Sequence, residues 1–147
     1  MENQAGSLGM AAGDFPAQRE FSLPARTDAI AETADQMMAF IAASGGAGGK
    51  EDEIALALQE ALANAVTHGC QEDASKTVRC RVGCGGTAGV MITVRDEGPG
   101  FDPGVVASPL STSGLSADHG RGIHMIRGLM DEVHFRHNGT EIVMWKK

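Results

Sequence analysis

Hydrophobic residues recur at the three-and-four spacing of an amphipathic helix in three parts of the chain. The first part begins at a capping residue, Thr27 or Asp28, and the second begins with a run of acidic side chains, which favours a helix start. Gly69 is a natural stop for the second. The predicted helices span residues 27–43, 51–68 and 120–130.

Other segments alternate apolar and polar residues, which is the pattern of a strand with one buried face. These segments span residues 19–23, 77–83, 90–96, 133–135 and 141–145. Asn138-Gly139 between the last two is a strong hairpin signal, and the glycine-rich link 83–89 suits a second hairpin. Hairpin-joined strands with helices segregated among them predict an α+β two-layer sandwich.

The length of 147 residues predicts one domain, which we place at residues 17–147. Residues 1–16 are rich in Gly and Ala, and we expect a disordered N-terminal tail there. The chain shows no signal peptide and no apolar run long enough to span a membrane, so a cytoplasmic protein is expected. A net charge of −7 argues against nucleic acid as a direct partner.

The three cysteines do not form a disulfide framework, because one would be left over. Cys80 and Cys84 share a strand face with valines and are predicted to be buried thiols rather than metal ligands. Cys70 lies at a helix end, where we expect more exposure.

Glu60 and Asn64 are four residues apart on the second predicted helix, so their side chains point the same way. The pair is compatible with a polar shoulder that faces solvent. On this pair alone the solvent-facing shoulder is favoured by roughly two to one. The alternative is a site, because an amide oxygen can ligate Mg²⁺ and a neighbouring carboxylate can accept a proton.

Two glycine-rich motifs flank a long segment that has no convincing helix or strand. Asp96 ends a strand and is followed by Gly98 and Gly100, which permit a close approach of the backbone to a flat ligand, although a simple turn has the same pattern. Gly120-Arg121-Gly122 opens the third helix, where bare N–H groups can bind phosphate. The segment between them, residues 97–119, is expected to act as a lid.

Taken together, these motifs resemble the GHKL (Bergerat) ATP-binding fold, and within it the anti-sigma-factor serine/threonine kinases of the RsbW/SpoIIAB type. Residues 60–69 are similar to the N box of that family, residues 96–103 to its first glycine box, and residues 120–133 to its second. The resemblance covers residues 19–147 and implies a mixed, mostly antiparallel sheet.

The resemblance also implies roles for individual residues and a need for ATP and Mg²⁺. Asp96 would bind the exocyclic amine of adenine, Asn64 would hold Mg²⁺ against the triphosphate, and Glu60 would act as general base on a serine or threonine hydroxyl. The remaining matched residues would shape the nucleotide pocket or lie close to the nucleotide: Gly98, Gly100, Gly120, Arg121, Gly122 and Thr140.

Such kinases bind a sigma factor, phosphorylate a small STAS-type anti-anti-sigma protein and commonly form homodimers, so the same partners are expected here. Two other functions stay open. One is a nucleotide-gated binding module without kinase activity. The other is the detached ATPase domain of a histidine kinase, although no histidine here is followed by the Glu and Pro of a phosphoacceptor helix.

Overall fold

The structure is a computed structural model that describes residues 12–100 and 117–147, with side chains placed for residues 13–100 and 120–147. Most of the expected N-terminal tail and the expected lid, residues 1–11 and 101–116, therefore lie outside the described residues.

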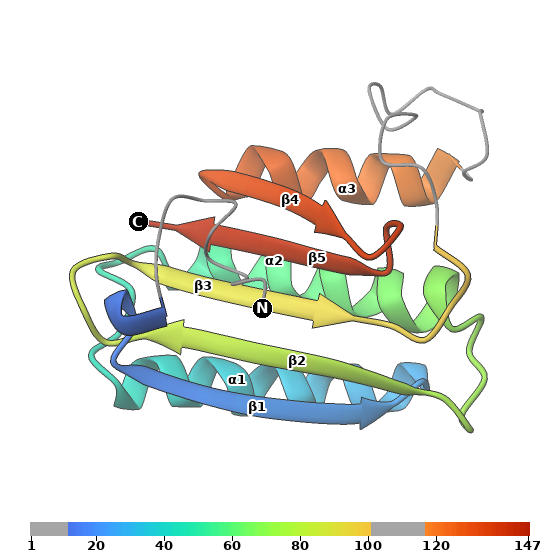
Figure 1. Cartoon of the computed structure of the whole chain (residues 1–147), viewed down its shortest axis with the longest axis horizontal. Helices are drawn as coiled ribbons and strands as arrows, with labels where there is room; N and C mark the ends of the chain where they lie inside the picture. Colours follow the sequence, from blue (N-terminus) through green and yellow to red (C-terminus); the bar gives the residue numbers. More distant parts are fainter. Residues whose placement is uncertain (1–11, 101–116) are drawn as a thin grey trace.

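Five strands form one sheet in the order β1-β2-β3-β5-β4, and every neighbouring pair is antiparallel (Figure 1). The α+β class is confirmed. The expected admixture of parallel pairing is wrong for the described sheet, because hairpins join β2 to β3 and β4 to β5. The strands are β1 (Ala17–Pro24), β2 (Thr77–Cys84), β3 (Val90–Arg95), β4 (Glu132–Arg136) and β5 (Glu141–Lys146).

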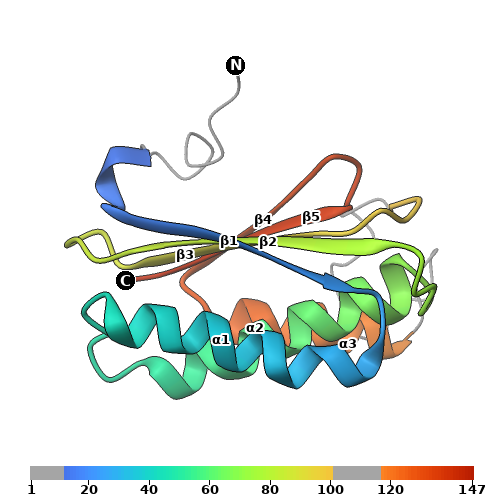
Figure 2. The same cartoon turned by 90° about the horizontal axis from the view of Figure 1, so that it is seen from below.

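Three helices cover one face of this sheet (Figure 2). They are α1 (Ile30–Ala43), α2 (Glu51–Asn64) and α3 (Ala117–Leu129). The core lies between the layers, because alternate strand residues such as Val82 and Ile92 pack against Leu58 and Leu62 of α2 and Ile126 of α3. The two-layer sandwich follows from this match between the two-residue period of the strands and the apolar stripes of the helices.

The helix boundaries differ from the sequence expectation at three places. A 3₁₀ turn, Thr27–Ala29, precedes α1, and Asp28 pairs with Arg26 at 3.1 Å instead of capping the helix. The α-helical part of α2 ends at Asn64 and continues as a π-helical turn, Ala65–Gly69. The third helix begins at Ala117 rather than Gly120, since Ala and Asp before the glycines are favourable in a first turn.

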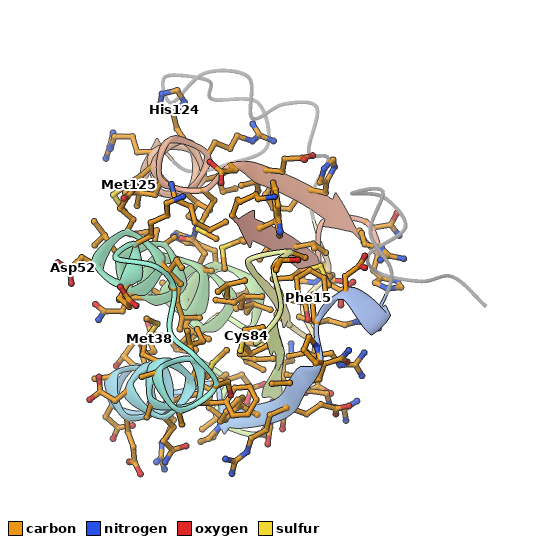
Figure 3. All side chains as sticks on the ribbon, turned by 90° about the vertical axis from the view of Figure 1, so that its left-hand side faces the viewer. Phe15, Met38, Asp52, Cys84, His124 and Met125 are labelled. Atoms are coloured by element: carbon orange, nitrogen blue, oxygen red, sulfur yellow. The ribbon has the colours of Figure 1, made fainter. Side chains whose placement is uncertain are left out.

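The side of the sheet away from the helices is partly covered near the N-terminus of the described chain. A 3₁₀ turn, Ala12–Asp14, brings Phe15 against Met91 and Val143, and Phe15 is only 1% exposed (Figures 2 and 3). Phe15 lies in the segment expected to be a tail. Its burial shows that ordered packing begins a few residues before residue 17.

All three cysteines are free and buried. The expectation for Cys80 and Cys84 is confirmed, and burial raises the pKa of the Cys80 thiol to about 12. The expectation of a more exposed Cys70 is wrong, because the turn after the π-helical segment carries its side chain inward. In the part of the chain that the structure describes, no helix is long and apolar enough to cross a membrane.

Candidate functional site

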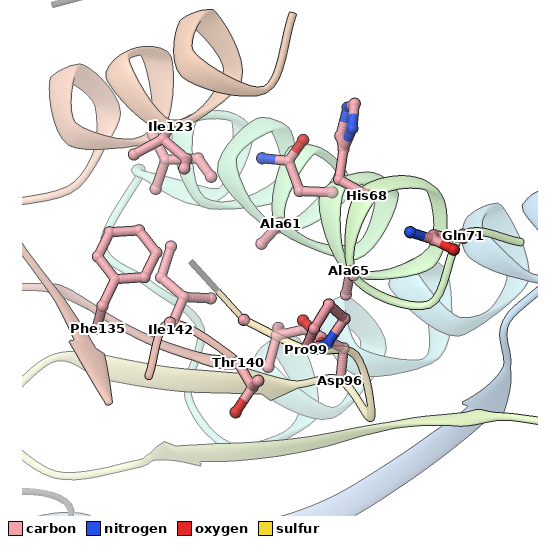
Figure 4. Close-up of a pocket in the computed structure, with 16 residues that line it drawn as sticks. Ala61, Ala65, His68, Gln71, Asp96, Pro99, Ile123, Phe135, Thr140 and Ile142 are labelled. Atoms are coloured by element: carbon pink, nitrogen blue, oxygen red, sulfur yellow. The ribbon is translucent and has the colours of Figure 1, made fainter. Parts of the chain in front are cut away.

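A pocket of about 270 Å³ opens between the end of α2, the end of β3, helix α3 and the β4–β5 hairpin (Figure 4). One side is polar and carries Asn64, His68, Gln71, Asp96 and Thr140. The opposite side is apolar and carries Val94, Ile123, Ile126, Phe135 and Ile142. An apolar wall facing a few convergent polar groups is the usual construction of a site for a flat organic ligand.

The π-helical turn shapes the polar wall. Its bond from Cys70 N–H to Ala65 O is 2.8 Å long and spans five residues instead of four. Asn64, directly before the turn, and His68 and Gly69 within it all line the pocket. Such insertions are frequent at functional sites because they redirect side chains without ending the helix.

Asp96 follows β3 and is held by two hydrogen bonds, one at its backbone and one at its carboxylate. Its N–H donates to Thr140 O at 2.9 Å, and its Oδ1 accepts from Gly98 N–H at 2.7 Å. Its carboxylate packs against Gly69, where an added Cβ would lie 2.8 Å from Oδ1 and collide with Oδ2. Burial raises the pKa of this carboxyl above its ordinary value, against a smaller lowering by the Gly98 hydrogen bond.

The first pair of glycines lets three segments meet beneath the pocket. A Cβ on Gly98 would collide with Gly69 O of the π-helical turn. Gly100 has a φ of +82°, and a Cβ there would collide with Asn138 O of the β4–β5 hairpin. The motif therefore connects the end of α2 with the hairpin that carries Thr140, whose Oγ1 donates to His137 O at 2.8 Å.

The second pair of glycines behaves differently. Because α3 begins at Ala117, Gly122 falls in its second turn, where N–H groups bond within the helix, and the expected helix start at Gly120 is wrong. Gly120 and Gly122 are buried, Arg121 is exposed, and none of the three lines the pocket. What Gly122 provides is space for α2, since a Cβ there would collide with Glu60 Oε2 and lie 3.1 Å from Asn64 Nδ2.

Glu60 and Asn64 thus meet at one point of α3, as the four-residue spacing predicts. Asn64 lines the pocket, whereas Glu60 is half-buried against Gly122 and does not line it. Among the described residues, no group of three His, Cys, Asp or Glu side chains could hold a metal ion alone. One amide oxygen and one nearby carboxylate do fit Mg²⁺ that arrives with phosphate oxygens and water.

The sequence analysis did not select the apolar wall. Ile142 and Val94 could have been found from the strand alternation that turns them toward the helices, beside Thr140 and Asp96. Phe135 could not, because its place depends on how β4 pairs with β5. Arg127 of α3 lies with Cζ 5.6 Å from the centre of the Phe135 ring, which adds a cation–π contact at this wall.

Comparison with known proteins agrees with this fold. A family model described as a histidine kinase-like ATPase domain matches residues 23–146. Among solved structures, the RsbU and RsbW domains of Rv1364c from Mycobacterium tuberculosis are similar, with a TM-score of 0.59 and 20% identity over 87% of this chain. The match covers 30% of that chain, so this chain spans less than a third of its length. No curated protein matches.

Proposed function

Because the chain belongs to the histidine kinase-like ATPase domain family, we propose that this pocket binds ATP with Mg²⁺ for transfer of phosphate to a protein serine or threonine. One observation carries the proposal. A single pocket has the Asp96 carboxylate at the end of β3 and the Asn64 amide at the end of α2, and the Glu60 carboxylate meets the Asn64 amide at Gly122.

Asp96 supports recognition of adenine. Its Oδ1 already accepts the Gly98 N–H, and no described donor bonds Oδ2, which suits the exocyclic amine of the base. The apolar wall that includes Ile142 and Phe135 would cover a face of the ring. A charge-assisted hydrogen bond of this kind contributes about 1.5–3 kcal/mol.

Asn64 supports the phosphate end. Its amide oxygen would ligate Mg²⁺, whose remaining ligands would be phosphate oxygens and water. The bound nucleotide supplies a phosphoryl group and a leaving group. Gly98, Gly100, Gly120 and Gly122 would permit close approach of the backbone, and Arg121 and Thr140 would lie near the nucleotide.

Glu60 would accept the proton of the attacking hydroxyl. It lies one helical turn before Asn64, and both side chains converge on Gly122, so a hydroxyl that approaches the terminal phosphate from this side would come within its reach. In phosphoryl transfer, positioning and charge neutralisation provide most of the catalysis, and proton removal provides less.

We further propose that the protein is an anti-sigma factor, with a sigma factor and a STAS-type anti-anti-sigma protein as partners, and that it forms a homodimer. The RsbW domain named in the similar solved structure supports this choice. A sigma-factor partner would place the protein in the cytoplasm.

A binding module without kinase activity is the second candidate, and one observation favours it. Glu60 is packed against Gly122 and does not line the pocket. If that arrangement persists when nucleotide is bound, the carboxylate cannot act as a base.

Transfer of phosphate from radiolabelled ATP to a STAS-type protein of the same genome separates the two candidates. We expect Glu60→Gln to leave ATP affinity nearly unchanged and to slow transfer by about 10²–10⁴-fold, the usual range for a positioned base. Asp52→Asn is the matched control, because this exposed carboxylate lies in the first turn of the same helix.

Two outcomes would contradict the kinase proposal or part of it. If the wild type binds ATP and a sigma factor but transfers no phosphate, the binding module is correct. If Glu60→Gln transfers phosphate as fast as Asp52→Asn, the protein is a kinase but Glu60 is not its base.

A further inference from the structure

The face of the sheet away from the helices carries a row of polar residues that crosses all five strands, and four of the five are charged. The strand register places Ser22, Arg79, Arg95, Glu141 and Arg136 side by side, one from each strand. Phe15 covers the other end of this face, where it packs on Met91 and Val143. Arg79 and Arg95 are both exposed, and the helices α1, α2 and α3 all lie on the opposite face of the sheet (Figure 2).

Arg79 and Arg95 are direct cross-strand partners. Side chains at such positions start only about 5 Å apart, and like charges there destabilise a sheet. Within the described chain, neither arginine forms an ion pair. The protein as a whole has more acidic than basic residues and a net charge of −7. Two adjacent arginines without a carboxylate partner are therefore unexpected in it.

Asp96, the residue after Arg95, faces the pocket, and burial raises its pKa by more than Arg95 lowers it. The other nearby carboxylates are engaged elsewhere. Glu141 lies next to Arg95 in the row but is buried, with its Oε1 4.0 Å from Arg136 Nε and 3.5 Å from His137 Nε2. Glu20 pairs with Arg81 at 2.8 Å. The Glu97 side chain accepts the Thr77 N–H at 2.6 Å.

The row lies directly behind the nucleotide pocket. Along β3, Val94 faces the pocket and Arg95 faces away, and the next residue, Asp96, turns back into the pocket. At the start of β5, Ile142 and the preceding turn residue Thr140 line the pocket, and Glu141 between them belongs to the row. A molecule bound to Arg95 would therefore contact β3, a strand that also lines the pocket, from the other side.

We propose that Arg79 and Arg95 form a docking site for an acidic segment of a partner protein, which neutralises the two guanidinium groups with aspartate or glutamate side chains. Guanidinium groups bind carboxylates in a two-pronged geometry, which an exposed cross-strand pair can offer side by side. Nucleic acid suits the site less well, because two arginines on an acidic protein give a small footprint beside the carboxylates of Glu20 and Glu97.

Two occupants from the chain itself fit less well. The undescribed N-terminal segment, residues 1–11, contains one carboxylate, that of Glu2. A second copy could offer the acidic surface of α1 and α2, but a contact between a sheet face and a helix face does not close on itself and would build open filaments.

A labelled peptide that alternates glutamate and serine tests the proposal without nucleotide, so its result is independent of the proposed kinase activity. We expect binding that weakens with salt, and a loss of about tenfold or more in the Arg79→Ala/Arg95→Ala variant. Arg19→Ala/Arg26→Ala is the matched control, since it removes two exposed arginines outside the row and is expected to change affinity by less than about twofold.

Arg79→Glu separates a docking role from a structural one. A glutamate at this position would face Arg95 and turn a repulsive pair into an attractive one, so we expect Tm to rise by about 1–3 °C while peptide binding is lost. A structural role would predict that stability and binding change in the same direction.

Several results would overturn the proposal. They are no peptide binding by the wild type, equal losses in the two double variants, or tighter binding of a single-stranded DNA oligonucleotide than of the peptide. Salt-sensitive self-association that disappears in the Arg79→Ala/Arg95→Ala variant would assign the face to a second copy.

Discussion

Replacing Gly122 by alanine tests whether α3 keeps a glycine there to accommodate the side chains of Glu60 and Asn64. The same helix offers a control, because Gly128 is exposed and an added Cβ there would have nothing within 4 Å. Within a helix, alanine is more stable than glycine by about 0.5–1 kcal/mol. We therefore expect Gly128→Ala to raise the free energy of unfolding by about this amount.

At Gly122 the same gain is opposed by contacts across the helix interface. The new Cβ would collide with Glu60 Oε2, lie 3.0 Å from Glu60 Cδ and lie 3.1 Å from Asn64 Nδ2. These atoms belong to the ends of side chains, so both side chains are expected to move aside while α3 keeps its place. Moving these side-chain ends aside costs less than overpacking a rigid core, which is about 1–3 kcal/mol, so we expect Gly122→Ala to be less stabilising than Gly128→Ala.

Displacing Asn64 should also weaken the nucleotide site. We expect Gly122→Ala to lower Mg·ATP affinity by about tenfold, which corresponds to about 1.4 kcal/mol, whereas Gly128→Ala should bind as the wild type does. Urea unfolding and titration calorimetry of the two variants measure both quantities. If Gly122→Ala is as stabilising as Gly128→Ala and binds Mg·ATP normally, the contact between α2 and Gly122 is not present in solution.

Three further predictions concern the two ends of the pocket. Asn64→Ala should lower the affinity for Mg·ATP far more than the affinity for metal-free ATP, because it removes one oxygen ligand of Mg²⁺. Equal losses of the two affinities in calorimetry would show that Asn64 does not ligate Mg²⁺. Asp96→Asn should lower ATP affinity by about 10–100-fold, because an amide N–H₂ would face the adenine amine; an unchanged Kd would reject the adenine role. Since burial raises the pKa of the Asp96 carboxyl, its ionisation opposes folding: the stabilisation present below its ordinary pKa is lost as pH rises through the raised value. Asp96→Asn should therefore gain stability relative to the wild type as pH rises through this range, and parallel curves of Tm against pH for the two proteins would contradict the raised pKa.

The sequence was most informative where one element carries the whole signal. The four-residue spacing of Glu60 and Asn64 was enough to place both on one side of a helix, and the structure brings both against Gly122. The hairpin around Asn138-Gly139 was equally local, because residues 137–139 all need positive φ, which Asn and Gly tolerate well.

The sequence was least informative about helix ends and about packing between segments that are distant in the chain. The start of α3 moved back to Ala117, and the last turn of α2 became π-helical, because helix ends depend on packing as much as on the residues that mark them. Phe15 belongs to a segment of tail-like composition, yet the sheet offers Gly83 without a side chain, so that the ring packs there.

Composition, periodicity and motif order thus determined the α+β class, the three helices and the residues at the two ends of the pocket, since each depends on neighbours in the chain. Strand order, the apolar wall with Phe135 and the facing pair of Arg79 and Arg95 were decided by tertiary structure alone. The reason is that antiparallel register sets which distant residues stand side by side, and no spacing within a single strand encodes its partner.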